Sequence, residues 1–248
     1  MPLYRDHAIV LRTHKLGEAD RIVTMLTRSH GKVRAVAKGV RRTTSRIGSR
    51  MEPFMLADVQ LYEGRNLDIV SQVETLEPYA RRICEDYGLF TAATAMVETV
   101  DSLVDLEKEP ARDHFMLLHG GLGALSRREH DAGLVLDSFL LRSLALAGYA
   151  PSFDECATCG APGPHRAFAV AGGGATCENC RQPGSAAPAP EVFSLLAALI
   201  DGRWREADSS EGRHRREAAG LVAAYAQFHM ERRVRSLTHV DRSDQGGR

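Results

Sequence analysis

The sequence has 248 residues, of which 44% are hydrophobic and 26% charged, proportions typical of soluble globular proteins and not of disordered ones. No run approaches the roughly 18 apolar residues that a membrane helix needs, and the first residues lack the apolar stretch of a signal peptide, so we expect a cytoplasmic protein. Lys and Arg together number 32, as do Asp and Glu. The formal net charge is therefore zero and does not indicate a polyanionic partner. Such a partner is attracted by the local electrostatic field of a basic patch and not by the net charge of the protein.

The first 78 residues predict short strands and no long helix. Apolar and polar residues alternate in Lys32–Lys38 with the period of two that is typical of a strand with one wet face. Gly31 supplies the free backbone that a tight turn before this strand needs. Five such strands predict a small barrel or sandwich. The expected strands are Tyr4–Thr13, Arg21–Thr27, Lys32–Lys38, Phe54–Glu63 and Leu67–Leu76.

A basic segment lies within this part of the chain. Residues 1–80 contain 13 basic and 9 acidic side chains, and no acid occurs between Asp20 and Glu52. Even spacing is expected to put Lys32, Arg34 and Lys38 on one face of a strand, and the aperiodic stretch 41–50 predicts a mobile loop. Such a track suits the phosphates of a flexible strand of nucleic acid. The predicted DNA-binding residues are Lys32, Arg34, Lys38, Arg41, Arg42, Arg46 and Arg50.

Two observations favour a plainer interpretation of the basic segment. Arginine outnumbers lysine 28 to 4 over the whole chain, which indicates a compositional bias, and basic side chains often do no more than solvate an exposed face. We prefer nucleic-acid binding because the cations follow one another without acidic partners.

From about residue 79 the hydrophobic period changes to that of amphipathic helices. Apolar residues recur at helical steps in the stretches 83–104 and 115–125, and further helices are expected over Leu134–Ala147, Val192–Ile200 and Glu217–Leu237. Gly148 is a good residue to end the third of these helices. The predicted divisions are a barrel over 1–78, a helical domain over 79–150 and 186–240, a cysteine-containing insertion over 151–185 and a frayed, disordered tail over 241–248.

The insertion carries two C-x-x-C pairs, which predict a metal site. Cys156 and Cys159 form the first pair, and Cys177 and Cys180 form the second. One tight turn can place both sulfurs of a pair about 2.3 Å from one zinc ion, and two such turns complete a tetrahedron. With all four positions filled by cysteine, the ion is structural and not catalytic. An iron–sulfur cluster or a redox dithiol are the alternatives. The fifth cysteine, Cys84, is expected to be a small buried hydrophobe.

No sequence motif of an enzyme emerges. There is no G-x-S-x-G, Walker loop, dinucleotide fingerprint or H-E-x-x-H. Glu98, Asp101 and Asp105 could place carboxylates on one face of a helix, but a solvated face is the better interpretation of them than a metal-dependent nuclease site. The sequence therefore predicts a binding protein.

These features together resemble the RecO family of bacterial recombination mediators. The resemblance rests first on the stretch Gly17-Glu18-Ala19-Asp20-Arg21-Ile22-Val23 and then on Ala37-Lys38-Gly39-Val40-Arg41-Arg42. It continues through Leu26-Thr27, Gly31-Lys32, Ser45-Arg46, Pro53-Phe54, Leu76-Glu77, Tyr225-Ala226-Gln227-Phe228-His229 and Arg235-Ser236-Leu237. It spans nearly the whole chain. The fold that it implies is α+β and multidomain: an N-terminal five-stranded OB barrel followed by an all-helical domain with an inserted four-cysteine zinc module.

The resemblance also implies a function in DNA repair without bond chemistry. Such a protein binds single- and double-stranded DNA, anneals complementary strands and, with RecR, helps to load RecA onto DNA coated by single-strand-binding protein, in the cytoplasm at the nucleoid. The single-strand-binding protein has an acidic tail with an apolar tip, which needs a hydrophobic pocket bordered by arginine. Arg127, Arg128 and Arg142 are the candidates for this arginine. The alternative function is an RNA-binding or transcription-associated OB and zinc-ribbon protein, whose basic face reads ribose hydroxyls.

Overall fold

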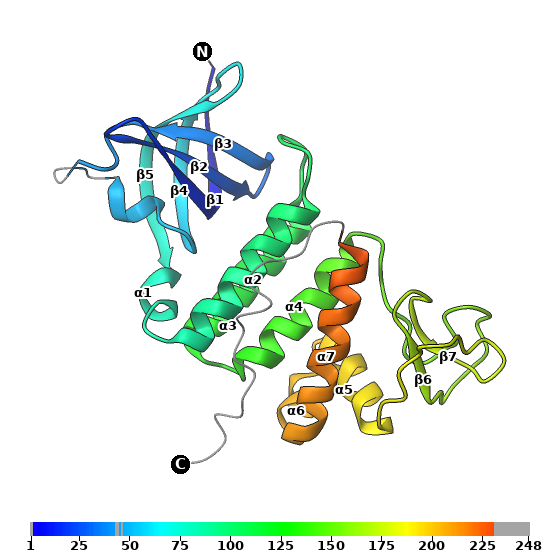
Figure 1. The fold of residues 1–248 in the computed structure, drawn as a ribbon. Coiled ribbons are helices and arrows are strands. Elements are labelled where there is room, and N and C mark those ends of the chain that lie inside the picture. The colour runs from blue at the N-terminus through cyan, green and yellow to red at the C-terminus, as the bar shows by residue number, and fades with distance from the viewer. Residues whose placement is uncertain (1, 43–44, 46, 231–248) are drawn as a thin grey trace. The chain divides into compact units, whose positions relative to one another are not determined.

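The computed structural model describes residues 2–42, 45 and 47–230 of the chain. It divides into two compact units, residues 1–127 and 128–248, which are described separately. The first unit contains the strands β1 to β5 and the helices α1 to α3, and the second contains the cysteine segment and the remaining helices (Figure 1). None of the helices in the described part of the chain has the length and apolar character needed to cross a bilayer.

Five strands form a closed barrel in the order β1-β2-β3-β5-β4. The neighbours run antiparallel except β3 and β5, which close the barrel as a parallel pair with Ala35 opposite Asp68. Alternate residues fill the interior, among them Val10, Met25, Val33 and Val59. This arrangement is that of a small OB-like barrel. The strands are β1 (Leu3–Leu16), β2 (Asp20–Thr27), β3 (Gly31–Ala37), β4 (Met55–Tyr62) and β5 (Asp68–Pro78).

Two features of the barrel differ in detail from the sequence prediction. The loop expected over 41–50 ends in a one-turn 3₁₀ helix, η1 (Gly48–Met51), because the Met51 side chain is fully buried in the barrel core and draws the backbone inward. The fourth strand begins at Met55 and not at Phe54, because Phe54 has a positive φ of 70° that a strand does not accommodate.

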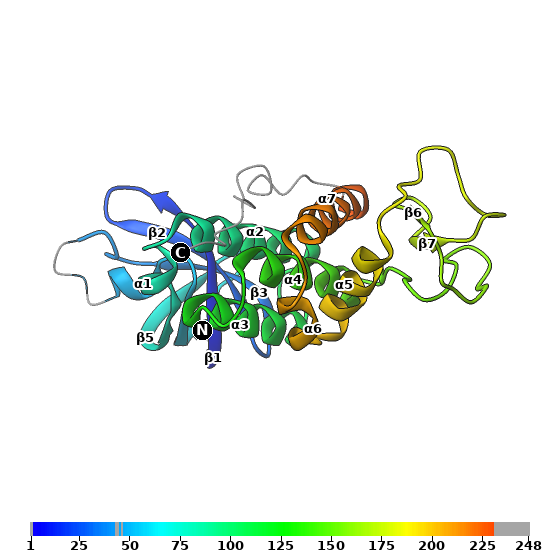
Figure 2. The same ribbon diagram turned by 90° about the horizontal axis from the view of Figure 1, so that it is seen from below.

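The helices of the first unit lie against the outside of the barrel. Their bounds are α1 (Tyr79–Ile83), α2 (Tyr87–Leu103) and α3 (Arg112–Arg127). α2 and α3 run side by side (Figures 1 and 2), with α2 touching β1 and α3 touching β2. The outward-facing Ile9 and Leu26 are consequently buried. Asp86 separates α1 from α2 by accepting a hydrogen bond from the Leu89 amide at 3.1 Å, which is the geometry of an N-cap.

The second unit is a group of helices with the cysteine segment attached. The helices are α4 (Ala132–Leu146), α5 (Pro190–Asp201), α6 (Trp204–Asp208) and α7 (Gly212–His229), and α4, α5 and α7 pack on one another. The cysteine segment contains a two-stranded sheet of β6 (Ala167–Ala169) and β7 (Gly174–Thr176). Buried Phe168 of β6 packs edge-on against Tyr225 of α7 with ring centroids 6.0 Å apart. The part of the last predicted helix beyond Met230 lies outside the described residues.

The α+β architecture predicted from the sequence is confirmed: a five-stranded N-terminal barrel is followed by helices and by a segment that carries the four clustered cysteines.

Candidate nucleic-acid interface and metal site

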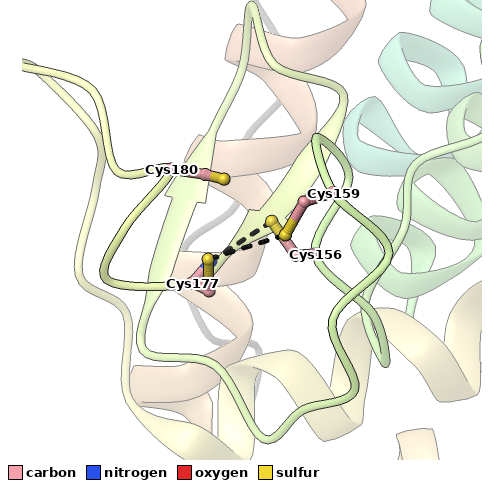
Figure 3. Close-up of side chains that lie close together, drawn as sticks. All are labelled: Cys156, Cys159, Cys177 and Cys180. Atoms are coloured by element: carbon pink, nitrogen blue, oxygen red, sulfur yellow. Dashed lines mark hydrogen bonds between the residues drawn. The ribbon is translucent and has the colours of Figure 1, made fainter.

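The four cysteines of the two C-x-x-C pairs come together in the second unit (Figure 3). The Sγ atoms of Cys156, Cys159, Cys177 and Cys180 all lie within 4.8 Å of one another, and those of Cys159 and Cys177 are 3.8 Å apart. Four sulfurs at about 2.3 Å from a central zinc would be separated by about 3.8 Å in a regular tetrahedron. The donor set and its spacing therefore fit a tetrahedral metal ion.

The backbone of the turns favours a thiolate in this cluster. Amide groups point at the Cys156 sulfur, with the Cys177 nitrogen at 3.4 Å, and these bonds, first from Cys177 and then from Cys159, lower the pKa of Cys156 to about 6. Hydrogen bonds with the Cys177 and Cys159 side chains raise the pKa of Cys180 to about 12. A cation bound by this cluster would replace the remaining thiol protons, because thiolates and not thiols ligate a metal ion.

Two of the predicted DNA-binding residues are paired with acidic residues of the protein itself. The side chain of Lys32 is only 10% exposed, and its Nζ donates to the Asp101 carbonyl oxygen at 2.9 Å and lies 3.5 Å from Asp101 Oδ1. Arg34, the next residue on this face of β3, forms an ion pair of 3.5 Å with Glu107. The third residue of this set, Lys38, is exposed in the turn that follows the end of β3 at Ala37.

The end of α2 and the connection between α2 and α3, which the sequence interpretation did not place against the barrel, supply these partners: Asp101 lies in α2 and Glu107 in the connection. The Lys108 amide donates to the Lys32 carbonyl oxygen at 2.9 Å, and Lys108 Nζ donates to Asp68 Oδ1 at 3.2 Å. The solvated face expected for Asp101 is wrong, because this carboxylate is one-fifth exposed and accepts a 2.7 Å hydrogen bond from Arg12 Nε. The sequence signal for these contacts is the excess of acids over residues 101–109, where Asp101, Asp105, Glu107 and Glu109 accompany the single base Lys108.

The other predicted cations that the structure describes are exposed beyond the end of β3. Lys38, Arg41 and Arg42 all belong to the turn that follows this strand. Arg41 holds the turn against the β1–β2 connection, because its Nη1 donates to the carbonyl oxygens of Gly17 and Glu18 at 3.2 and 2.9 Å. Arg50 of η1 donates Nη1 to the Val73 carbonyl oxygen at 2.8 Å, and Arg46 lies outside the described residues. Lys38, Arg41, Arg42 and Arg50 are called the exposed basic group below.

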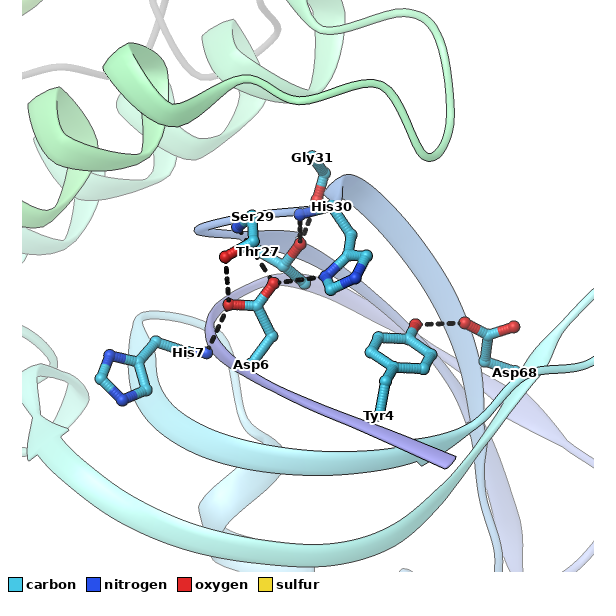
Figure 4. A network of polar contacts seen from close by, with 8 residues as sticks. All are labelled: Tyr4, Asp6, His7, Thr27, Ser29, His30, Gly31 and Asp68. Atoms are coloured by element: carbon cyan, nitrogen blue, oxygen red, sulfur yellow. Dashed lines mark hydrogen bonds and ion pairs between the residues drawn. The ribbon is translucent and has the colours of Figure 1, made fainter. Parts of the chain in front are cut away.

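Buried carboxylates fix the barrel end that faces the α2–α3 connection (Figure 4). Asp6 accepts hydrogen bonds from the Ser29 amide at 3.0 Å and from His30 Nδ1 at 2.6 Å. Asp68, 1% exposed, accepts from Tyr4 and Lys108. Burial, together with the Asp68 carboxylate, raises the pKa of Tyr4. The hydrogen bonds to Asp6 order the turn that leads into Lys32.

The prediction that Cys84 is buried is wrong. Cys84 is exposed because it is the residue that ends the short helix α1, where the chain turns away before α2. Partial burial, followed by the charge of Glu52, still raises the pKa of its thiol.

Comparison with known proteins relates the chain to one class, proteins of DNA recombination and repair. Residues 1–79 match the family described as Recombination protein O N terminal, and residues 84–238 match Recombination protein O C terminal. A protein of Nocardioides sp. named DNA repair protein RecO is 59% identical over 243 residues, covering 97% of this chain and 100% of that protein. Proteins of the same name from Thermobifida fusca and Streptomyces griseus are 57% and 54% identical, each over 98% of this chain and 100% of theirs.

The chain therefore belongs to the RecO family of DNA repair proteins. The resemblance that the sequence motifs indicated is confirmed over both units.

Proposed function

We propose that this protein is a non-catalytic recombination mediator. It binds single- and double-stranded DNA, anneals complementary strands and, with RecR, helps to load RecA onto DNA that single-strand-binding protein coats, which places it at the nucleoid in the cytoplasm. Membership of a DNA repair family supports the general role. The OB-like barrel supports the mode of binding, since such barrels commonly hold nucleic-acid strands.

The observation that carries the proposal is the exposed basic group at the end of β3. Lys38, Arg41 and Arg42 stand close together in one turn, which the Gly39 amide ties to Asp20 Oδ1 at 2.7 Å. Because the backbone of this turn is fixed, its cations are pre-arranged for phosphates and lose little freedom on binding. Neutralised phosphates release counterions and repel a second strand less, which favours annealing.

Lys32 and Arg34 contribute less to this interface than the sequence suggests. Each is already paired with an acidic group of the segment 101–107, so a phosphate would have to displace that group first. We therefore assign the DNA contacts mainly to Lys38, Arg41, Arg42 and Arg50, with Arg46 as a further candidate.

The four clustered cysteines are proposed to hold one structural zinc ion. All four donors are sulfurs at tetrahedral spacing, and such closed sites contribute to folding and not to catalysis. We propose the barrel 1–78 as the DNA-binding domain and 151–185 as the zinc module. The docking site for the tail of the coating protein is proposed for the helical part, near Arg127, Arg128 or Arg142.

The decisive experiment is strand annealing with and without coating protein. The variant R41E/R42E/R46E reverses three cations beyond β3, and the control R112E/R166E/R205E makes the same change in net charge at other exposed positions. We expect the first variant to lose annealing and the control to keep it. If both variants anneal as the unmodified protein does, the exposed basic group is not the interface.

Two competing functions are tested on the same protein. Matched DNA and RNA strands in competition decide between DNA repair and an RNA-binding function, and preference for RNA would reject the proposal. Labelled DNA incubated with Mg²⁺ or Mn²⁺ tests for a nuclease, and we expect no cleavage, since Asp101 is paired with Arg12 and Lys32.

A further inference from the structure

The first unit contains a cavity between the barrel and its helices, and the proposed function uses only Arg50 of its lining. Its volume is about 850 Å³, within the range of about 300–1,000 Å³ that is common for ligand pockets. Leu11, Met55 and Val97 provide apolar walls, contributed by β1, β4 and α2. Leu11 stands at an irregularity of β1 between Val10 and Arg12, and such bulges often occur beside functional sites.

Two phenylalanines form an aromatic wall of this cavity. The rings of Phe54 and Phe90 meet edge to face, with centroids 5.9 Å apart and planes at 82°. Phe54 is 3% exposed, whereas Phe90 is 42% exposed, so part of the Phe90 ring is available to a ligand. Phe54 has a φ of 70°, an unfavourable conformation for a bulky residue that typically occurs where function requires it.

Cations stand at the same cavity. Arg12, Arg50 and Arg81 line it together with Glu52 and two other acids. Glu52 is paired with Arg21 at 2.6 Å, and Asp101 is paired with Arg12 and Lys32. Arg50 bonds to a carbonyl oxygen and not to a carboxylate, and Arg81 is exposed on α1. Both arginines therefore remain suited to an anionic ligand.

We propose that this cavity receives one base of a single DNA strand. The base stacks on Phe90, and the neighbouring phosphates of the strand contact Arg50 and Arg81. The inference rests on the proposed function and specifies its ligand as an unpaired strand. The flat ring of a base matches the aromatic wall of Phe54 and Phe90, and the phosphates on either side of it match Arg50 and Arg81. Because Arg50 also belongs to the exposed basic group, a strand seated here continues onto cations that follow β3. An isolated acidic peptide with an apolar tip would lack that continuation.

The test measures the affinity of the full-length, metal-loaded protein for oligo(dT) and for an abasic oligonucleotide of the same length. Stacking of one base on an aromatic side chain is worth about 1–3 kcal/mol by alanine substitution. We expect Phe90→Ala to weaken oligo(dT) binding by about tenfold and to leave abasic binding and the salt dependence unchanged. Phe90→Trp should retain the affinity for oligo(dT).

Tyr87→Ala is the matched control, since Tyr87 lies on the same helix, is 64% exposed and does not line the cavity. Cys84 does line it, so bound oligo(dT) should slow alkylation of Cys84 by N-ethylmaleimide, and the abasic strand should not. Equal oligo(dT) affinities of the Phe90→Ala and Tyr87→Ala variants would overturn the inference and leave the proposed function intact. Protection of Cys84 by an acidic peptide with a terminal aromatic residue, but not by oligo(dT), would also overturn it. If the unmodified protein binds neither oligonucleotide, the proposed function fails as well.

Discussion

The backbone of Gly31 lies against the carbonyl oxygen of Glu109. A Cβ atom at Gly31 would stand 1.6 Å from that oxygen, and Gly31 also has a positive φ of 67°. The close approach lets the segment between α2 and α3 pair with β3, where the Lys108 amide reaches the Lys32 carbonyl oxygen. A residue at the start of a barrel strand thus controls how near a distant acidic segment comes to two basic side chains.

We predict that Gly31→Ala destabilises the first unit more than Gly17→Ala does. Both glycines have positive φ, but a Cβ at Gly17 would meet no atom within 4 Å, so Gly17→Ala measures the backbone strain alone, about 1 kcal/mol. Gly31→Ala must also push the Glu109 backbone away, and we expect about 1–3 kcal/mol in addition. Urea unfolding of both variants measures this difference. Equal losses of stability in the two variants would mean that the Glu109 backbone moves away from the new Cβ atom at no measurable cost in free energy.

A second prediction concerns which cations contact DNA. Each phosphate contact contributes about −0.7 to the logarithmic salt slope for single strands, so five contacts would give a slope of about −3.5. We expect R41E/R42E/R46E to reduce the magnitude of the slope by about 2. Lys32→Ala should leave it unchanged, because Lys32 is bound to Asp101. Titrations at several salt concentrations give the slopes, and a large effect of Lys32→Ala would show that DNA displaces Asp101.

The success and failure of the sequence predictions have physical reasons. The strand β3 was predictable to within one residue at each end, because side chains that alternate between core and surface impose a period of two on the sequence. The cysteine site was predictable because two residues between thiolates suffice for a local turn. The pairing of Lys32 with Asp101 joins residues 69 positions apart, and no local pattern records such a contact. For this reason the sequence analysis interpreted Asp101, the partner of Lys32, as part of a solvated helix face.

The helix boundaries give the same lesson at shorter range. Hydrophobic spacing indicates helix on both sides of residue 84, but the break depends on the side chain of Asp86, which caps α2. That break exposes Cys84, which was expected to be a small buried residue of an amphipathic helix. An N-cap aspartate ahead of an apolar run is a signal that the sequence does contain, and weighing it would have placed the turn correctly.

The metal site yields a third prediction. Natively purified protein should contain close to one zinc ion per chain, as measured by atomic absorption. Cys84→Ala should keep the metal, because Cys84 is not part of the cluster of four. Cys177→Ser should lose it and destabilise the cysteine segment, since a closed four-cysteine site contributes to folding directly. Protein without zinc, or zinc that disappears with Cys84→Ala, would contradict the assignment.

The last prediction is a pH dependence that originates at the contact between α1 and α3. Tyr79 OH and His119 Nδ1 are 2.9 Å apart, and burial is the main cause that lowers the pKa of His119. Because the charged imidazole is disfavoured in the folded state, the unfolded chain binds more protons below the ordinary histidine pKa of about 6.5. Stability from this group is complete above that pH and falls as the pH decreases. We expect His119→Gln, which keeps a polar partner for Tyr79, to lose less stability between pH 7.5 and pH 5.5 than the unmodified protein. Urea unfolding at both pH values measures the difference, and parallel losses in the two proteins would assign the acid sensitivity to other groups.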